Sequence, residues 1–170
     1  MSKEDYIKEK ELPNQSKAIP TEEMITLVDL IKTHVCKITC NDGTHGTGFF
    51  CKIPIGWGNY LTTLMTNNHV LNESDIQPGK TIKFSINNDY KDYNILIDNT
   101  RKTYTNYNYD VTIIEIKEDD KIDEKSFFFL DDQIFQEDSA KLFRNRQIFL
   151  LHYPKGIKME ISAGVIQNIT

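Results

Sequence analysis

Short runs of β-type residues, separated by turn residues, dominate the chain after Val35. The runs read VCKITC, TGFFCKI, YLTTLMT, TIKFSIN, YNILID and VTIIEIK. NDG after the first run and Pro78-Gly79 before the fourth are typical turn sequences. No helical repeat separates the runs, so the pattern predicts six closely spaced strands in an antiparallel barrel or sandwich.

One helical pattern precedes these strands. Apolar residues recur at helical spacing, namely Met24, Leu27, Val28 and Ile31. Thr21 is a suitable N-cap, and Glu22 and Glu23 suit the positive end of the helix dipole. We therefore expect an amphipathic helix over 21–34 that packs on the outside of the main domain, after a polar arm over 1–20.

A less regular part follows the sixth run. Residues 118–144 are acidic and carry an apolar FFFL patch, which predicts a connector whose aromatic rings pack against another element. The runs QIFLLHY and KMEISAGVIQNI then predict two further strands, joined by Pro154-Lys155-Gly156.

Composition limits the classes of partner. The 170 residues carry a formal net charge of -5, and 39% are hydrophobic, enough for a core. The acidic balance argues against nucleic acid as a partner, because phosphate binding needs a basic surface. The chain has no apolar stretch of the roughly 18–20 residues that a membrane span needs. The polar N-terminus lacks the apolar segment of a secretory signal, and the cysteine count is odd, so we expect a cytoplasmic protein with reduced thiols.

His69 is the histidine with the most informative setting. It directly follows the run LTTLMTNN, so it should lie at a strand end and face the next loop. Asp110 opens the apolar run VTIIEI, and a carboxylate there is costly to bury without a partner. A carboxylate that accepts the Nδ1–H of a histidine fixes its tautomer and stabilises the imidazolium. The alternative is that Asp110 only turns the chain into its strand.

The glycines of GTHGTGFF, residues 43–50, do not fit a phosphate-binding loop. The spacing departs from G-x-G-x-x-G, and no strand-to-helix junction follows. We expect these glycines to allow a close backbone approach or a bulge in the sheet.

Five segments in order resemble the trypsin-like (chymotrypsin-fold) serine peptidases. They are GTGFF, TNNHVL, DVTIIEI, YPKG and SAGVI, and the likeness is closer to the glutamyl-endopeptidase-like and bacterial-type peptidases than to the digestive enzymes. The resemblance implies an all-β, chymotrypsin-like double β-barrel with His69 as general base and Asp110 as its orienting carboxylate. It divides the chain into a complete first barrel over 35–117, the connector over 118–144 and the start of a truncated second barrel over 145–170.

The chain departs from this family at the nucleophile. It has no G-x-S-G segment, and Ser162, in EISAGVI, matches a structural strand that precedes the nucleophile loop. The resemblance thus implies a serine-type endopeptidase domain with peptide or protein substrates, no metal or organic cofactor, and no activity of this chain alone. The alternative is a degenerate, non-enzymatic domain that binds proteins, with a partner chain over the incomplete second barrel.

Two other chemistries have weaker patterns. The candidate ligands of a zinc site are His34, Cys36, Cys40, His45 and Cys51. Their spacing, C-x3-C-x4-H-x5-C with His34 shortly before it, is not that of a standard zinc module. A cysteine nucleophile would have to take the missing serine position, yet all three cysteines precede His69.

Overall fold

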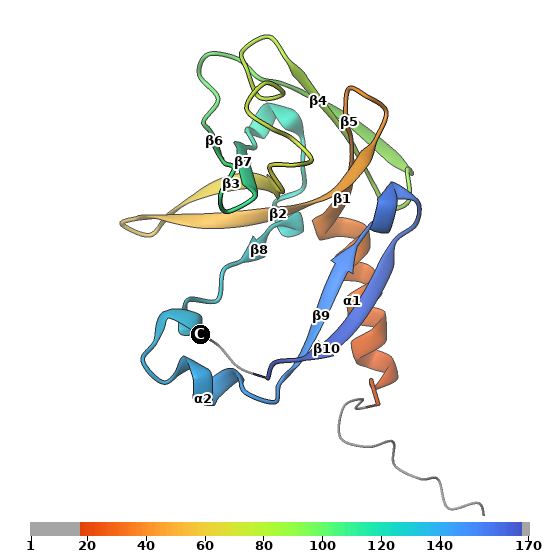
Figure 1. Cartoon of the computed structure of the whole chain (residues 1–170), viewed down its shortest axis with the longest axis vertical. Helices are drawn as coiled ribbons and strands as arrows, with labels where there is room; N and C mark the ends of the chain where they lie inside the picture. Colours follow the sequence, from red (N-terminus) through yellow and green to blue (C-terminus); the bar gives the residue numbers. More distant parts are fainter. Residues whose placement is uncertain (1–17, 168–170) are drawn as a thin grey trace, which may run out of the picture.

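The computed structural model describes residues 18–167, which form a mostly β structure with two sheets (Figure 1). The strands of the larger sheet are β1 Val35–Thr39, β2 His45–Gly56, β3 Asn59–Thr66, β4 Thr81–Ile86, β5 Lys91–Leu96, β6 Thr103–Asn106, β7 Val111–Glu115 and the short β8 Phe128–Phe129. The smaller sheet pairs β9 Gln147–His152 with β10 Glu160–Val165. The helices are α1 Thr21–His34, the short α2 Ser139–Phe143 and four 3-10 turns. Most of the predicted polar arm, up to residue 17, lies outside the described residues.

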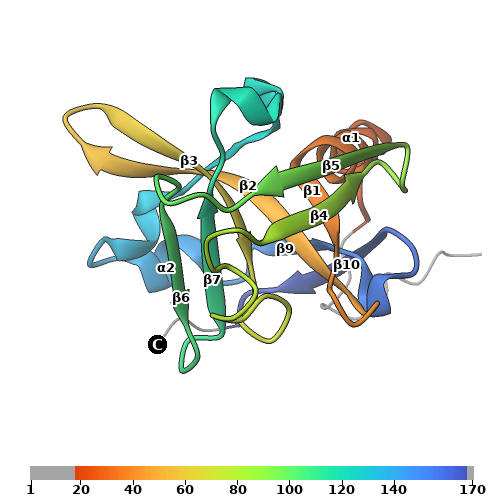
Figure 2. The same cartoon turned by 90° about the horizontal axis from the view of Figure 1, so that it is seen from above.

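The larger sheet is one curled half-barrel (Figures 1 and 2). Its strand order is β5-β4-β1-β2-β3-β7-β6, and the neighbours on this path are antiparallel, whereas β8 pairs with β2 in parallel. All six runs predicted as strands are strands, so the antiparallel β architecture is confirmed at this level. The sheet has two strands that the pattern did not predict. TYTN of β6 has no alternation of apolar residues, and β8 is only two residues long and lies in the predicted connector.

The core lies inside the curl of this sheet. Phe50, Leu64 and Ile114 are fully buried on its inner face. The ring of Phe127 packs edge-on against Phe50 at 5.7 Å, so the connector does contribute an aromatic residue to the core. The rest of the connector is built from 3-10 turns, β8 and α2, as its irregular sequence suggests.

The helix α1 is present where the pattern predicts it, but the predicted N-cap is wrong. The carbonyl of Pro20 accepts the first helical hydrogen bond, from the N–H of Met24 at 3.0 Å, and Thr21 is already helical. Proline suits this boundary because its extended backbone precedes the helix and it has no N–H to satisfy. Among the described residues, no helix is both long and apolar enough for a membrane crossing.

The second sheet is attached through a small cluster of its own. Ile31 of α1, Val35 of β1 and Tyr153 after β9 are all buried together. Leu151 and Ile161, which face each other in the hairpin register, pack against this cluster. The two predicted strands and their Pro-Lys-Gly turn are therefore confirmed, and α1 links them to the half-barrel.

A buried ion pair fixes the turn that precedes β6. The guanidinium of Arg101 donates two hydrogen bonds to the carboxylate of Asp120, at 2.6 and 2.9 Å, and both side chains are buried. Arg101 also donates to the carbonyls of Leu96 and Glu115. This side chain thus ties β5, β7 and the first turn of the connector together.

We predict that Asp120→Ala lowers the free energy of unfolding by about 3 kcal/mol, because it leaves the buried guanidinium without its counter-charge. Denaturant unfolding monitored by circular dichroism measures this change. The control is Asp138→Ala, which breaks the exposed pair of Asp138 with Lys141 and should leave the stability nearly unchanged. Equal effects of the two substitutions would contradict the assignment.

Candidate active site

The pairing of β3 with β7 brings His69 next to Asp110. Thr66, the last residue of β3, lies opposite Thr112 near the start of β7, so the turn after β3 and the turn before β7 lie at the same end of these two strands. There Nδ1 of His69 lies 2.7 Å from Oδ2 of Asp110. The main-chain N–H of His69 donates to the other carboxylate oxygen, Oδ1, at 2.9 Å. The predicted contact is therefore present, with the carboxylate on the Nδ1 side of the ring.

The residues before His69 hold this turn in place. The hydroxyl of Thr66 donates to the carbonyl of Thr47 on β2 at 2.7 Å. The amide of Asn67 donates to the carbonyl and to Oδ2 of Asp110, each at 3.2 Å. Asn67 therefore supports the carboxylate from a second direction, a role that the sequence pattern alone did not assign.

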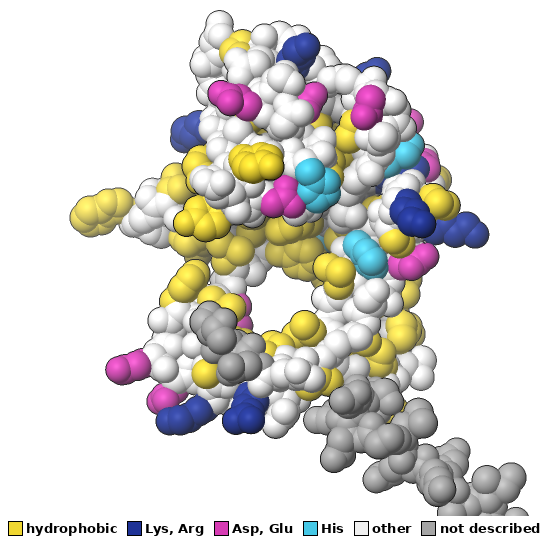
Figure 3. Space-filling view, viewed as in Figure 1, with side chains coloured by type: hydrophobic (Ala, Val, Ile, Leu, Met, Phe, Trp, Pro, Cys, Tyr) yellow, Lys and Arg dark blue, Asp and Glu magenta, His cyan; other side chains and the backbone are white. Residues whose placement is uncertain are grey.

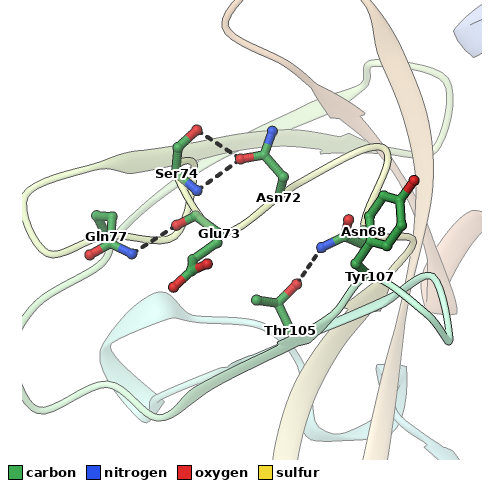
Figure 4. Close-up of a pocket in the computed structure, with 7 residues that line it drawn as sticks. All are labelled: Asn68, Asn72, Glu73, Ser74, Gln77, Thr105 and Tyr107. Atoms are coloured by element: carbon green, nitrogen blue, oxygen red, sulfur yellow. Dashed lines mark hydrogen bonds between the residues drawn. The ribbon is translucent and has the colours of Figure 1, made fainter.

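A chain of side-chain hydrogen bonds anchors the other side of the turn. The amide of Asn68 donates to the hydroxyl of Thr105 on β6 at 2.6 Å (Figure 4). The hydroxyls of Thr105 and Thr112 lie 2.7 Å apart, and that of Thr112 donates to the carbonyl of Leu71 at 2.6 Å. The two asparagines of TNNHVL and the threonine of DVTIIEI were the only sequence signals of this network.

A polar hollow lies beside this network. It is lined by the residues of Figure 4, which are Asn68, Asn72, Glu73, Ser74, Gln77, Thr105 and Tyr107. Ser74 and Asn72 are bonded to each other there, with the main-chain N–H and the hydroxyl of Ser74 both donating to Oδ1 of Asn72. The serine is thus engaged in its own turn.

The glycines of GTHGTGFF allow the close approach that we expected. A Cβ atom at Gly46 would lie 2.5 Å from the methyl groups of Val70, the residue after His69. The thiol of Cys40 donates to the carbonyl of the same Val70 at 3.2 Å. The turn that carries His69 is therefore packed tightly against β2 through Val70.

Asp110 differs from the prediction in its burial. Its side chain is 44% exposed, and the residue lies in the turn before β7, with a positive φ of 48°. Aspartate tolerates this left-handed backbone better than most residues. The pKa of the Asp110 carboxyl lies below its usual value, chiefly because the carboxylate accepts a hydrogen bond from the main-chain N–H of His69. The hydrogen bond and the electrostatic interaction with the imidazole, and the amide of Asn67, lower this pKa further.

His69 also lines a groove of about 460 Å³, which is separate from the polar hollow. The corner between β9 and β10 forms its far wall, with His152, Tyr153, Pro154 and Lys155. The N–H of Tyr153 donates to the hydroxyl of Thr47 at 2.9 Å. Gly156 has a positive φ of 66° and leaves no room for a Cβ atom, which would lie 2.0 Å from that of His45. The half-barrel and the hairpin thus meet closely along this groove.

No nucleophile is bonded to His69 within residues 18–167. The Nε2 atom of His69 makes no hydrogen bond to any described residue, and its ring is 70% exposed. The hydroxyl of Ser162 instead lies 3.0 Å from Nε2 of His152, on the hairpin. Ser2 and Ser16 lie outside the described residues.

The cysteines do not form a metal or nucleophile site in the described part of the chain. Residues 18–167 contain no group of three or more His, Cys, Asp or Glu side chains that could hold a metal ion. The three thiols are free, and burial raises the pKa of each of them, most of all that of Cys36. A raised pKa disfavours the reactive thiolate.

Comparisons of the chain with protein-family models, curated proteins and solved structures found no match. The chemistry of the site therefore has to be argued from its own atoms. A histidine with a carboxylate on Nδ1 and a free Nε2 can accept a proton at Nε2, because the carboxylate stabilises the resulting imidazolium.

We predict that the pKa of the Asp110 carboxyl stays below its usual value in a His69→Ala variant. Alanine keeps the main-chain N–H, which is the largest cause of the lowered pKa. Carboxyl ¹³C NMR titration measures this pKa, and a return to the usual value would contradict this cause.

The lowered pKa of Asp110 also makes the stability depend on pH. Because the folded-state pKa lies below the unfolded-state one, the carboxylate stabilises the fold above the unfolded-state pKa. That contribution is lost as the pH falls through the folded-state pKa.

Proposed function

We propose that this chain carries the His–Asp part of a trypsin-like serine endopeptidase centre, on a chymotrypsin-like double β-barrel. The observation that carries the proposal is the contact between His69 and Asp110, 2.7 Å on the Nδ1 side, in a histidine that lines a groove and whose Nε2 has no hydrogen bond to residues 18–167. In this function His69 takes the proton of a serine hydroxyl at Nε2, and Asp110 orients the ring and stabilises its positive charge.

The arrangement of elements supports the same proposal. The curled sheet presents His69 and Asp110 from two neighbouring strand ends, and the β9–β10 hairpin faces them across the groove. An extended peptide in this groove would lie between the two units. In the proposed fold the hairpin begins the second barrel, and the nucleophile loop would follow it.

The proposal needs a serine that the 170 residues do not supply in a G-x-S-G segment. A longer product of the same gene or a second chain would provide it, together with the N–H donors that stabilise the oxyanion. The absence of that motif also favours a second candidate function, a non-enzymatic domain that binds proteins along the same groove.

We predict that the 170-residue chain alone does not hydrolyse peptide or ester substrates. Loss of the nucleophile from a triad lowers kcat by a factor on the order of 10⁶. Fluorogenic peptides and a nitrophenyl ester provide the assay. Turnover that disappears in a His69→Ala variant would refute this prediction, since it would show a nucleophile within the chain.

We predict that a G-x-S-G segment follows in frame in the coding DNA downstream of Thr170, and that the product including it is an active peptidase. In that product Asp110→Asn should lower kcat by about 10⁴, because the amide favours the wrong tautomer of His69. The control, Asp132→Asn, changes an exposed carboxylate in the connector and should leave kcat unchanged. The absence of such a segment from the gene would favour the binding domain instead. Equal kcat values of the two variants would contradict the role proposed for Asp110.

A further inference from the structure

The β2–β3 hairpin extends beyond the rest of the larger sheet. β1 pairs with β2 only as far as Phe49, and β7 pairs with β3 only from Thr63 onward. Residues 53–61, here called the ribbon, pair only with each other within the described structure. Figures 1 and 2 both show this end of the hairpin projecting from the molecule.

Large apolar side chains stand exposed on the ribbon and on the neighbouring β8. Tyr60 and Phe129 join the two elements, with their rings edge to face at 5.8 Å. Figure 3 shows hydrophobic side chains out to the tip of the hairpin. Three aromatic and two aliphatic residues make up this surface, here called the aromatic patch. Their exposed fractions are given in parentheses: Ile55 (55%), Trp57 (101%), Tyr60 (51%), Phe129 (66%) and Leu130 (50%).

The area of the patch is large for a surface that faces only water. If each large apolar side chain offers roughly 150–250 Å², the five fractions together correspond to about 480–810 Å² of exposed surface. Monomeric proteins rarely expose contiguous apolar patches above a few hundred Å². A stable interface buries about 800 Å² on each partner, so one such patch comes close to what each half of a dimer needs.

The charge pattern favours a second copy of the chain over a charged partner. The stretch from Ile53 to Asn68 contains no Lys, Arg, Asp or Glu, and Asp131 first follows the patch after Leu130. Lys52 at the border of this stretch lies over the ring of Phe129, 5.1 Å from the ring centroid, and is paired with Glu124 of the same chain at 3.0 Å. In a symmetric dimer the same patch lies on both sides, so any charge would meet its own copy. The formal net charge of -5 makes an uncharged contact region the favourable one for self-association.

We propose that the aromatic patch is the contact surface of a symmetric homodimer, in which Trp57 of each copy packs against the patch of the other. The contact joins side-chain faces, because Pro54 removes an N–H from the free edge of β2 and hinders pairing through that edge. The tip of the ribbon and His69 lie at opposite ends of β3, so the dimer leaves the groove and the polar hollow beside His69 open.

The single tryptophan of the chain gives a direct test. Sedimentation velocity and tryptophan emission are measured on the purified chain over a concentration series from nanomolar to high micromolar. We expect dimers at high concentration and a shift of the emission to shorter wavelength that follows the dimer fraction. The double variant Tyr60→Ser/Phe129→Ser should raise the dimer dissociation constant at least about tenfold, since it removes two exposed rings of the contact.

The control is Tyr90→Ser, which removes an even more exposed ring from the turn between β4 and β5 and should leave dimerisation unchanged. A monomer at every concentration overturns the proposal. So does dimerisation without an emission shift, or with equal strength in the double variant. An emission shift caused by phosphatidylcholine vesicles in a protein that stays monomeric overturns it as well, and assigns the patch to a lipid surface.

Discussion

In the larger sheet, β3 and β7 are held in one antiparallel register, with Thr66 opposite Thr112, and the candidate site depends on that register. Burial specifies it: Leu64 and Ile114 face each other and are both fully buried. A slip by one residue would turn such side chains toward solvent and bring residues of the opposite face into the core. It would also move Asp110 away from His69, because the two residues lie just beyond the paired strands.

The hydroxyl and amide groups around the histidine turn strengthen the same register. Thr112 is completely buried, and its hydroxyl is bonded both to Thr105 and to the carbonyl of Leu71. A buried polar group without a partner destabilises a fold by about 1–3 kcal/mol, so any alternative pairing of β7 would be less stable by this amount for each group left unbonded. The turn that presents His69 is therefore fixed by side chains of three strands and does not rely on its own sequence alone.

The sequence was sufficient to predict the parts of this arrangement that rest on local pattern. Alternating apolar runs predicted six strands, and the helix pattern predicted α1, because both depend on neighbouring residues. β6 was missed because its stability comes from pairing with β7 and not from an apolar face. The His69–Asp110 contact was predicted from the cost of burying a carboxylate without a partner and from the family resemblance. The exposure of Asp110 and the support from Asn67 depend on how two turns meet in space. Thr21 was misjudged as N-cap because threonine is favoured there, whereas the preceding proline already fixes the extended backbone.

The two ends of β3 differ in the kind of surface that they present. At the end near His69, polar groups are bonded to one another, and main-chain and amide donors hold the carboxylate of Asp110 against the imidazole. At the other end, the ribbon has no charge and exposes aromatic rings on a projecting pair of strands. A rigid strand connects these ends, and the core side chains of β3 are buried between them. Binding at the ribbon would therefore leave the register that positions His69 undisturbed, since that register is fixed by contacts of Thr63–Thr66 with β7 and not by residues 53–61.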